Sequence, residues 1–276
     1  MKNYKQILEA INRGIKFALD DFEDNDEIQG QANSKVSHEH GTKEWLDLVN
    51  EVINLNLPSG TLWCKYNLGC NIDLLNNNSI SSTYEDWIGD HYAWGEIIPN
   101  NNVNMQIQDA WENYKYCGGS STLLNKYCPR GKNYWWAWDW SDANVNRTPP
   151  DGKIMLEDVD DPCKSKSSYL KFRMPSEEDV HELIENTYHK YIINYKNIKD
   201  LCGELFISKA NPENQLFIPC EYNKYKTFQS SCCWINSIDK KVPYEAYCLY
   251  FDDSVEPRIT SNQRANLYSI RPVLNL

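Results

Sequence analysis

Apolar positions near the start of the chain follow a helical period. Across residues 4–22 they recur every three or four positions, which predicts an amphipathic helix. The apolar members are Ile7, Leu8, Ile11, Ile15, Ala18, Leu19 and Phe22. An isolated helix of this length is marginal in water, so its apolar stripe needs a surface to cover. That surface is either the body of this chain or another subunit.

An acidic and then polar segment follows this helix. Six of the eight residues in the range 20–27 are acidic, and residues 30–43 contain few core-forming side chains. The acidic run lacks the glycine and glutamate offsets of an EF-hand loop, which favours a solvated linker. His38 and His40 could ligate a metal where three copies meet on a threefold axis, but a surface loop is the favoured interpretation. We predict that residues 1–43 form a docking arm.

From residue 44 the pattern changes to short apolar runs separated by Gly, Pro, Asn and Asp. These runs are rich in aromatic and β-branched residues, which is typical of strands. One helix interrupts them after Pro175, where Ser176 is a suitable N-cap and Asp179 completes a capping box. Its apolar stripe is Val180, Leu183 and Ile184. The chain is therefore predicted to be α+β, with short, mostly antiparallel strands over residues 44–276.

The net charge of the chain and the length of its apolar runs bear on whether it binds nucleic acid or membranes. The chain has 39 acidic and 28 basic residues and a formal net charge of −11. An acidic surface repels the phosphate backbone, which disfavours nucleic-acid binding. No apolar run is long enough to span a bilayer, and the first residues lack the continuous apolar stretch of a signal peptide. We therefore expect neither nucleic-acid binding nor membrane insertion, and a chain that stays in the cytosol where it is made.

Ten cysteines raise the question of disulfides. Thiols stay reduced in the cytosol and pack as small apolar side chains. Several of the ten lie inside apolar runs, so we expect buried thiols. The sequence has no C-x-x-C pair, and Cys232 is adjacent to Cys233, a spacing that suits neither a zinc site nor an ordinary disulfide. No metal or other cofactor is expected.

A series of short motifs occurs in a recognisable order. They are Leu57–Trp63, Asn67–Gly69, Glu85–Glu96, Tyr114–Cys117, Leu124–Cys128, Asp151–Asp161, Arg173–Ile184, Leu216–Tyr222, Trp234–Ser237, Ala246–Phe251 and Tyr268–Val273. Together they resemble the Fibrobacter-succinogenes-major-paralogous (FISUMP) type of domain, which is abundant in gut Bacteroidota and their phages, including crAss-like phages. The resemblance covers roughly residues 50–276. The chain departs from the family pattern at Asn54 and Asn56 and in a longer segment before Asp151.

The resemblance implies a fold as well as a family. The FISUMP type of domain is similar to the C-type-lectin fold of formylglycine-generating enzymes and of the variable proteins of diversity-generating retroelements. We therefore expect residues 44–276 to form a C-type-lectin-like domain with an aromatic insert at residues 129–150, preceded by the helical arm.

The same motifs indicate mainly structural roles for their residues. Pro58–Gly60 predicts a turn. Core aromatics are predicted within apolar or small-residue runs at Trp63, Trp94 and Trp234. Arg173 and Arg271 are expected to be buried, which requires carboxylate or carbonyl partners. The candidate carboxylates are Glu85, Asp90, Asp160 and Asp161.

Relatives of this fold include enzymes, so catalysis must be weighed. The histidines of the expected domain are single and never at metal-ligand spacing: His91, His181 and His189. No nucleophile elbow, glycine-rich phosphate loop or H-E-x-x-H motif is present. Adjacent carboxylates occur at Asp160–Asp161 and Asp252–Asp253, but such pairs are common in turns. We predict a protein that is not an enzyme.

Calcium-dependent sugar binding is the other activity that the resemblance implies. Its signature tripeptides are E-P-N and W-N-D. The chain offers only Glu256–Pro257–Arg258 and a scrambled Asn211–Asn214. Arg258 would place positive charge where the cation binds, so calcium-dependent lectin activity is not expected.

Two segments are candidates for a binding surface. The insert at residues 129–150 contains an aromatic cluster, Tyr134, Trp135, Trp136, Trp138 and Trp140. This cluster could be a lid over the core, an interface with another subunit or a stacking platform for a glycan. The resemblance also implies a ligand face between Trp234 and Arg271. Its polar members are Asn236, Asp239, Tyr244, Asp252, Arg258, Asn262 and Tyr268.

These observations lead to one function and two alternatives. The favoured hypothesis is a structural or adhesion protein of a phage virion, assembled in the host cytoplasm as part of an oligomeric assembly. Its arm would bind other virion proteins, and its lectin-like domain would bind a host-surface glycan or protein. The first alternative is a bacterial cell-surface or secreted binding protein. The second is an enzyme of the formylglycine-generating type.

Overall fold

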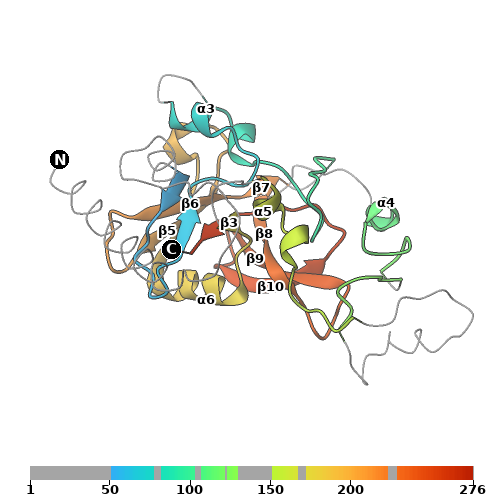
Figure 1. The fold of residues 1–276 in the computed structure, drawn as a ribbon. Coiled ribbons are helices and arrows are strands. Elements are labelled where there is room, and N and C mark those ends of the chain that lie inside the picture. Colours follow the sequence, from blue (N-terminus) through green and yellow to red (C-terminus); the bar gives the residue numbers. More distant parts are fainter. Residues whose placement is uncertain are drawn as a thin grey trace, which may run out of the picture. The chain divides into compact units, whose positions relative to one another are not determined.

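The computed structural model describes residues 51–77, 82–102, 107–121, 123–129, 151–166, 172–222 and 229–275. One compact unit, Glu51–Leu274, contains every helix and strand named below (Figure 1). The expected docking arm, with Ile7, Leu8, Ile11, Ile15, Leu19 and Phe22, lies outside the described residues, as does the domain boundary expected at residue 44. The aromatic cluster at residues 134–140 also lies outside them.

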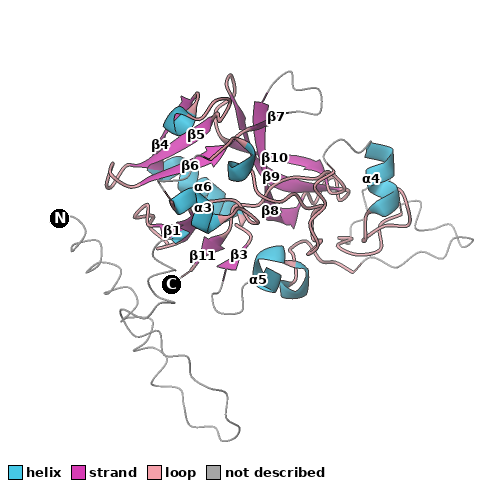
Figure 2. Cartoon of the chain, turned by 90° about the horizontal axis from the view of Figure 1, so that it is seen from above, coloured by secondary structure: helices cyan, strands magenta, loops and turns pink. Residues whose placement is uncertain are grey.

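The strands form three sheets, drawn in magenta in Figure 2. The first sheet contains, in spatial order, β1 (Val52–Ile53), β2 (Leu62–Cys64), β11 (Val273–Leu274) and β3 (Phe172–Arg173). The second contains β10 (Arg258–Gln263), β9 (Glu245–Asp252), β8 (Gln229–Ile238) and β7 (Glu221–Tyr222). The third contains β4 (Thr187–Ile192), β5 (Gly203–Ser208) and β6 (Gln215–Pro219). Every pairing of these strands is antiparallel, which confirms the predicted α+β class.

Short helices connect and cover the sheets. They are α3 (Ile72–Asn76), η1 (Glu85–Trp87), α4 (Ile107–Asn113), η3 (Asp158–Asp160), α5 (Pro162–Lys166), α6 (Glu177–Asn186) and η4 (Tyr195–Asn197). The capping box predicted for α6 is present: the Asp179 N–H donates to Ser176 Oγ at 3.2 Å, and the Ser176 N–H donates to Asp179 Oδ2 at 2.7 Å. Val180 and Leu183 are buried as predicted, and α6 contacts strands of both the second and the third sheet.

The core confirms the aromatic residues chosen from the sequence. Trp63, Trp94 and Trp234 are fully buried. The Trp94 indole N–H donates to Ile235 O at 2.7 Å, and the Trp234 indole N–H donates to Tyr92 O at 2.8 Å, so two of the rings also cross-link segments distant in sequence. The predicted turn at Pro58–Gly60 is also present. The Gly60 N–H donates to Leu57 O at 3.0 Å, and Gly60 has a φ of 76°, which glycine adopts without steric cost.

The arginine partners differ from those predicted. Arg271 is buried, but it donates to carbonyl oxygens rather than to a carboxylate: Asn67 Oδ1 at 2.9 Å, Cys64 O at 3.1 Å and Phe217 O at 3.2 Å. Arg173 forms an ion pair with Asp179 at 2.6 Å. Asp179 faces Arg173 because β3 ends just before the first turn of α6, so one carboxylate serves both the helix cap and the ion pair.

The four carboxylates expected as arginine partners have other roles. Asp160 binds Lys126, and Asp161 accepts from the Met174 N–H at 3.0 Å. Asp90 accepts from Asn101 Nδ2 at 3.1 Å, and Glu85 lies in the first turn of η1. The prediction of Glu85, Asp90, Asp160 and Asp161 as arginine partners is therefore wrong, and Asp179 takes that role for Arg173.

All ten cysteines are free, and eight of them are buried. Burial raises the pKa of the Cys70 thiol to about 11 and that of the Cys128 thiol to about 11. These thiols pack as apolar side chains, in agreement with the prediction. Within the described ranges no helix has the length and apolar character needed to cross a membrane.

Candidate functional site

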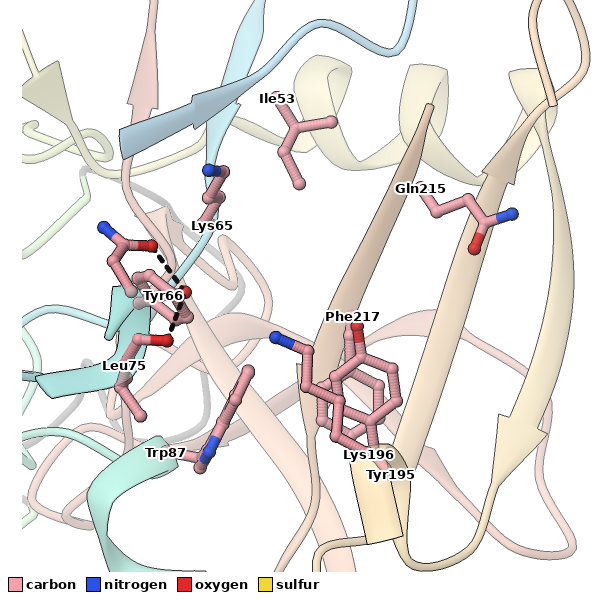
Figure 3. A pocket seen from close by; sticks show the side chains of 10 residues that line it. Ile53, Lys65, Tyr66, Leu75, Trp87, Tyr195, Lys196, Gln215 and Phe217 are labelled. Carbon is pink, nitrogen blue, oxygen red and sulfur yellow. Dashed lines mark hydrogen bonds between the residues drawn. The ribbon is translucent and has the colours of Figure 1, made fainter. Parts of the chain in front are cut away.

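A pocket of about 310 Å³ opens among six segments of the chain. Its volume lies at the lower end of the range of about 300–1,000 Å³ that is typical of small-molecule sites. Strands β1 and β6, the residues after β2, and helices α3, η1 and η4 supply its walls. Its lining residues are Ile53, Lys65, Tyr66, Leu75, Asn76, Trp87, Tyr195, Lys196, Gln215 and Phe217 (Figure 3).

Aromatic side chains form most of the apolar wall. The Tyr195 ring stacks on Phe217, with ring centroids 3.8 Å apart and planes inclined by 8°. Trp87 meets Tyr195 edge to face at 5.6 Å and Tyr66 at 5.3 Å. Such offset and edge-to-face pairs favour fixed ring positions. Figure 3 shows Tyr66 and Trp87 on one side of the pocket and the stacked pair on the other.

Two lysines bring positive charge to these rings. Lys196 Nζ lies 4.9 Å from the centroid of the Trp87 ring, within cation–π range, and is directed into the space between the aromatic walls (Figure 3). Lys65 is half-buried, and both burial and the charge of Lys196 lower its pKa. Among the residues that the structure describes, neither amine has a carboxylate within ion-pair distance. The pocket therefore holds positive charge that no described carboxylate neutralises.

The loop that carries Lys196 has unusual backbone geometry. Asn194, Lys196, Asn197 and Asp200 all have positive φ, between 53° and 66°. Asn and Asp tolerate this left-handed conformation, but Lys adopts it rarely. The Asp200 N–H donates to Asn194 Oδ1 at 2.9 Å, and Gln229 Nε2 donates to Asp200 O at 2.8 Å, so hydrogen bonds hold the loop. Backbone strain that is held by its surroundings is typical of functional sites.

Two amides give the pocket an oriented polar rim. The Tyr66 hydroxyl donates to Asn76 Oδ1 at 3.0 Å, which leaves the Asn76 amide N–H groups as donors. Gln215 Nε2 donates to Pro212 O at 3.0 Å, which leaves the Gln215 carbonyl oxygen as an acceptor. Both side chains are exposed at the rim. The pocket thus offers a neutral donor, a neutral acceptor and two cations around an aromatic wall.

The chemistry of this lining suits contact with an anion and with apolar surface. Among the described residues that line it there is no carboxylate, histidine or thiol, the groups most often used for acid–base or nucleophilic work. Burial raises the pKa of Tyr66 and of Tyr195, so both phenols are protonated at neutral pH. The arrangement can hold an anion and pack apolar surface.

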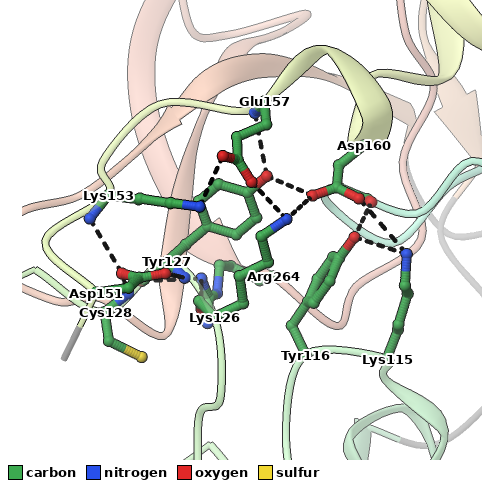
Figure 4. Close-up of polar contacts among 11 residues, drawn as sticks. Lys115, Tyr116, Lys126, Tyr127, Cys128, Asp151, Lys153, Glu157, Asp160 and Arg264 are labelled. Atoms are coloured by element: carbon green, nitrogen blue, oxygen red, sulfur yellow. Dashed lines mark hydrogen bonds and ion pairs between the residues drawn. The ribbon is translucent and has the colours of Figure 1, made fainter. Parts of the chain in front are cut away.

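A second cluster of charges surrounds Asp160 in η3 (Figure 4). Lys126 Nζ forms ion pairs with Asp160 and, at 2.6 Å, with Glu157. The Tyr127 hydroxyl donates to Asp160 Oδ2 at 2.6 Å, and Lys115 Nζ lies 3.5 Å from Asp160 Oδ1. The Asp160 side chain is only 5% exposed, so these contacts replace the water that its charge would otherwise bind.

The ionisation behaviour of this Asp160 cluster indicates a structural role. Burial opposes the Asp160 charge, but hydrogen bonds from Lys126, Tyr116 and Tyr127 lower the pKa of Asp160 to about 2. Burial opposes the charge of Lys126 as well, but its hydrogen bonds to Asp160 and Glu157 raise the pKa of Lys126 overall. Catalytic acids and bases are usually tuned toward the working pH, whereas here both partners move away from neutrality.

The single histidines make no site together. His91 is buried, and its Nε2 lies 2.5 Å from Glu221 Oε2; burial lowers the pKa of His91, but the hydrogen bond from its ring to Glu221 and the charge of Glu221 raise it overall. His181 is exposed on α6, and His189 lies on β4. Across the described part of the chain, no group of three His, Cys, Asp or Glu side chains is arranged to hold a metal ion.

The structure divides the expected C-terminal face between separate places. Asp239 and Tyr244 belong to the turn between β8 and β9, whereas Asp252 and Arg258 flank the turn at the other end of β9. Strand β9 has eight residues, which corresponds to a separation of about 25 Å. The Asp252 carboxylate accepts a hydrogen bond from the nearby Tyr250 hydroxyl at 2.6 Å, so a local contact already uses one of its oxygens. These four residues cannot contact one small ligand together.

The remaining members of that face pack inward in part. Asn236 lies at the irregularity of β8, and its Oδ1 is buried without a hydrogen-bond partner. Asn262 Nδ2 lies 3.6 Å from Cys232 Sγ. The Tyr268 ring packs on Trp234 with centroids 4.8 Å apart. These three side chains are half-buried rather than displayed as one surface.

Sequence reasoning did not identify the pocket. Its residues come from segments that are far apart in the chain, and most of them are aromatic residues that a sequence pattern assigns to the core. One local signal was present: the tract 194–197 combines two asparagines with Tyr195 and Lys196, and Asn tolerates a left-handed backbone. This signal predicts a tight loop that displays Lys196, but not the rings that face it.

Comparisons with known proteins add no family assignment. No protein-family model, curated protein or solved structure matches the chain significantly.

Proposed function

We propose that the chain is a non-enzymatic adhesion protein of a phage virion, in which a C-type-lectin-like domain carries a ligand pocket and an N-terminal arm binds other virion proteins. The resemblance to the FISUMP type of domain supports the lectin-like fold and the phage setting. The α+β class with antiparallel sheets is compatible with that fold. The pocket, the Asp160 cluster and the thiols each bear on one part of the proposal.

The aromatic pocket is the observation that carries the binding role. It combines fixed rings, two cations without carboxylate partners among the described residues and two oriented amides. Ligand sites typically combine an apolar wall with a few placed polar groups in this way. The Asp160 cluster, which is the densest group of charges described, has ionisation behaviour suited to stability rather than to proton transfer. A binding protein therefore fits these residues better than an enzyme does.

The cysteines favour a virion over an exported protein. Eight of the ten thiols are buried as apolar side chains, and this packing suits a protein that folds in a reducing compartment. An exported cell-surface protein of this size with ten cysteines would more often contain disulfides. Virion proteins assemble in the host cytoplasm before release.

Deletion of residues 1–43 tests the two-part organisation. We expect residues 44–276 to remain folded, with an unchanged cooperative melting transition, and to be missing from particles purified after complementation with the shortened gene. Mass spectrometry of particles carrying the full chain should detect it. Loss of folding on deletion would contradict a separable arm, and absence of the full chain from purified particles would contradict the virion assignment.

A further inference from the structure

We propose that the pocket binds an acidic saccharide, whose anionic group lies between Lys65 and Lys196 and whose sugar ring packs on the aromatic wall. This inference rests on the binding role proposed above and specifies the class of ligand. The anion can be a carboxylate or a sulfate, because a lysine ammonium acts as a point charge toward either.

The first argument is the sign and the cost of the local charge. Lys65 and Lys196 repel each other closely enough for Lys196 to oppose the charge on Lys65. The chain as a whole carries a net charge of −11, so a pair of cations with no carboxylate partner among the described residues runs against its composition. Perturbed ionisable groups in a pocket are associated with ligand sites. An anion placed between the amines would remove the repulsion and gain two charge-assisted contacts.

The second argument is the preorganisation of Lys196. The η4 loop holds Lys196 at a φ of 53°, which places Nζ over the Trp87 ring, 4.9 Å from its centroid. The stacked Tyr195 adjoins it in sequence, so the same loop presents a cation and a ring together. A positioned cation loses less conformational entropy on binding than a free lysine side chain does.

The third argument distinguishes a saccharide from other anions. A bare inorganic anion would not use the aromatic wall or the two rim amides at Asn76 and Gln215. Phosphate groups are commonly held by arginine forks or by backbone N–H groups at helix N-termini, and no arginine lines the pocket. A sugar ring presents apolar C–H faces to aromatic rings and hydroxyl groups to amides. The volume of about 310 Å³ is compatible with a short saccharide.

Calorimetric titration of the full-length chain tests the inference. The probes are digalacturonate, the same disaccharide with both carboxylates methyl-esterified, a sulfated lactose, and sodium acetate and sulfate as bare anions. We expect at least one of the two acidic saccharides to bind at least tenfold more tightly than the methyl ester and than either bare anion. Raising the ionic strength should weaken this binding.

Matched variants locate the site. Lys196→Gln and Lys65→Gln should each weaken binding of the acidic saccharide about tenfold, the loss expected for one charge-assisted contact. Lys240→Gln removes the same charge from the exposed turn between β8 and β9 and should leave the affinity unchanged. Melting curves of all three variants check that the fold is retained, and Tyr195→Leu tests the ring without introducing a charge.

Each contrary result has a distinct meaning. Equal affinity for the methyl ester would overturn the acidic-saccharide inference and leave the pocket as a binding site. Equal affinity for a bare anion would overturn the saccharide component. A loss with Lys240→Gln as large as with Lys196→Gln would refute the location. Absence of binding by every probe would overturn the inference, while the deletion and particle experiments would decide the virion role independently.

Discussion

The Asp160 cluster and the aromatic pocket both hold partly buried charge, and they differ in whether opposite charges meet. Around Asp160, two lysines and two tyrosine hydroxyls converge on one carboxylate. In the pocket, Lys65 and Lys196 both belong to the lining, and no carboxylate within the described segments pairs with either. The first arrangement pairs its charges within the protein, whereas the second has two positive charges without such a partner.

A third buried group, Glu204, shows that the partners of a charge, rather than its burial alone, decide the direction of its pKa shift. Asp160 and Glu204 are buried to a similar degree, with 3% and 4% exposure. The pKa of Asp160 falls to about 2, whereas burial and the nearby charge of Glu256 raise the pKa of Glu204 to about 7. Lysine and hydroxyl contacts account for the first shift, and the described residues provide no such donor for the second. Burial of a carboxylate therefore lowers stability only where no hydrogen-bond donor or opposite charge accompanies it.

The largest effect is expected from removing the central carboxylate. Asp160→Asn removes the buried carboxylate that pairs with Lys126 and Lys115, whose side chains are 24% and 53% exposed, and should lower the free energy of unfolding by about 3 kcal/mol at pH 7, measured by urea denaturation. Asp158→Asn in the same helix is the matched control. Its side chain is 81% exposed, so the change should be less than about 1 kcal/mol. Equal effects of the two substitutions would remove the distinction between satisfied buried charge and surface charge.

Glu204→Gln should act in the opposite direction. A carboxyl whose folded pKa is about 7, against an ordinary value of 4.5, holds a proton in the folded state that it loses when unfolded. Its stabilising contribution is complete below pH 4.5 and is lost as the pH rises through 7. The variant should therefore be more stable than the wild type by up to about 3 kcal/mol at pH 8.5 and equally stable at pH 4. Destabilisation at pH 8.5 would mean that the Glu204 charge has a partner.

The charge of Asp160 should give the opposite pH dependence: it stabilises the fold at neutral pH, and this contribution is lost in acid. Its folded pKa of about 2 lies below the ordinary value of 3.8, so between these values the unfolded chain binds more protons than the folded one. The contribution is present above pH 4 and is lost as the pH falls to 2, a change of about 2 kcal/mol. The stability difference between wild type and Asp160→Asn, followed by melts across pH 2–5, should shrink by about 2 kcal/mol toward the acid end. Parallel curves would contradict the pKa of Asp160.

The smallest effect is expected in the aromatic pocket. Lys65→Gln removes one of two cations that repel each other, so the free energy of unfolding should stay the same or rise by less than about 1 kcal/mol. Any rise should shrink in 1 M salt, which screens charges at this depth in part. Lys240→Gln again serves as the control. A loss of more than about 1 kcal/mol would indicate that Lys65 has a structural role and would contradict the distinction between the Asp160 cluster and the pocket.

Local features of the sequence were sufficient for part of the fold. The spacing of Ser176 and Asp179 predicted the start of α6, because a capping box needs only residues within one turn. The apolar runs around Trp63, Trp94 and Trp234 predicted buried rings, because burial follows from the surrounding hydrophobicity. Proline and glycine at residues 58–60 predicted a turn from backbone preferences alone.

The candidate site depended on contacts that no local pattern contains. The pocket joins Lys65 to Trp87, Lys196 and Phe217, which are separated by long stretches of chain. Sequence patterns place such aromatic residues in the core, which is correct for Trp87 and Phe217, but they do not show that Lys196 lies over the Trp87 ring or that Lys65 lines the same pocket. The expected ligand face between Trp234 and Arg271 illustrates the same limit, since the turns at the two ends of β9 separate its members.

The sequence by itself determined the strand-forming character of the apolar runs, the capped start of α6, the burial of three tryptophan rings and the apolar packing of the thiols, because these properties follow from residue type and near neighbours. It did not predict α3, α4 or α5. Only the tertiary structure decided which charges meet. Arg173 pairs with Asp179, and Asp160 pairs with two lysines. The charge of Lys65 is opposed by that of Lys196. The physical reason is that Coulomb interactions and desolvation depend on distances in space, and these are fixed only when the three sheets and their connecting loops are packed.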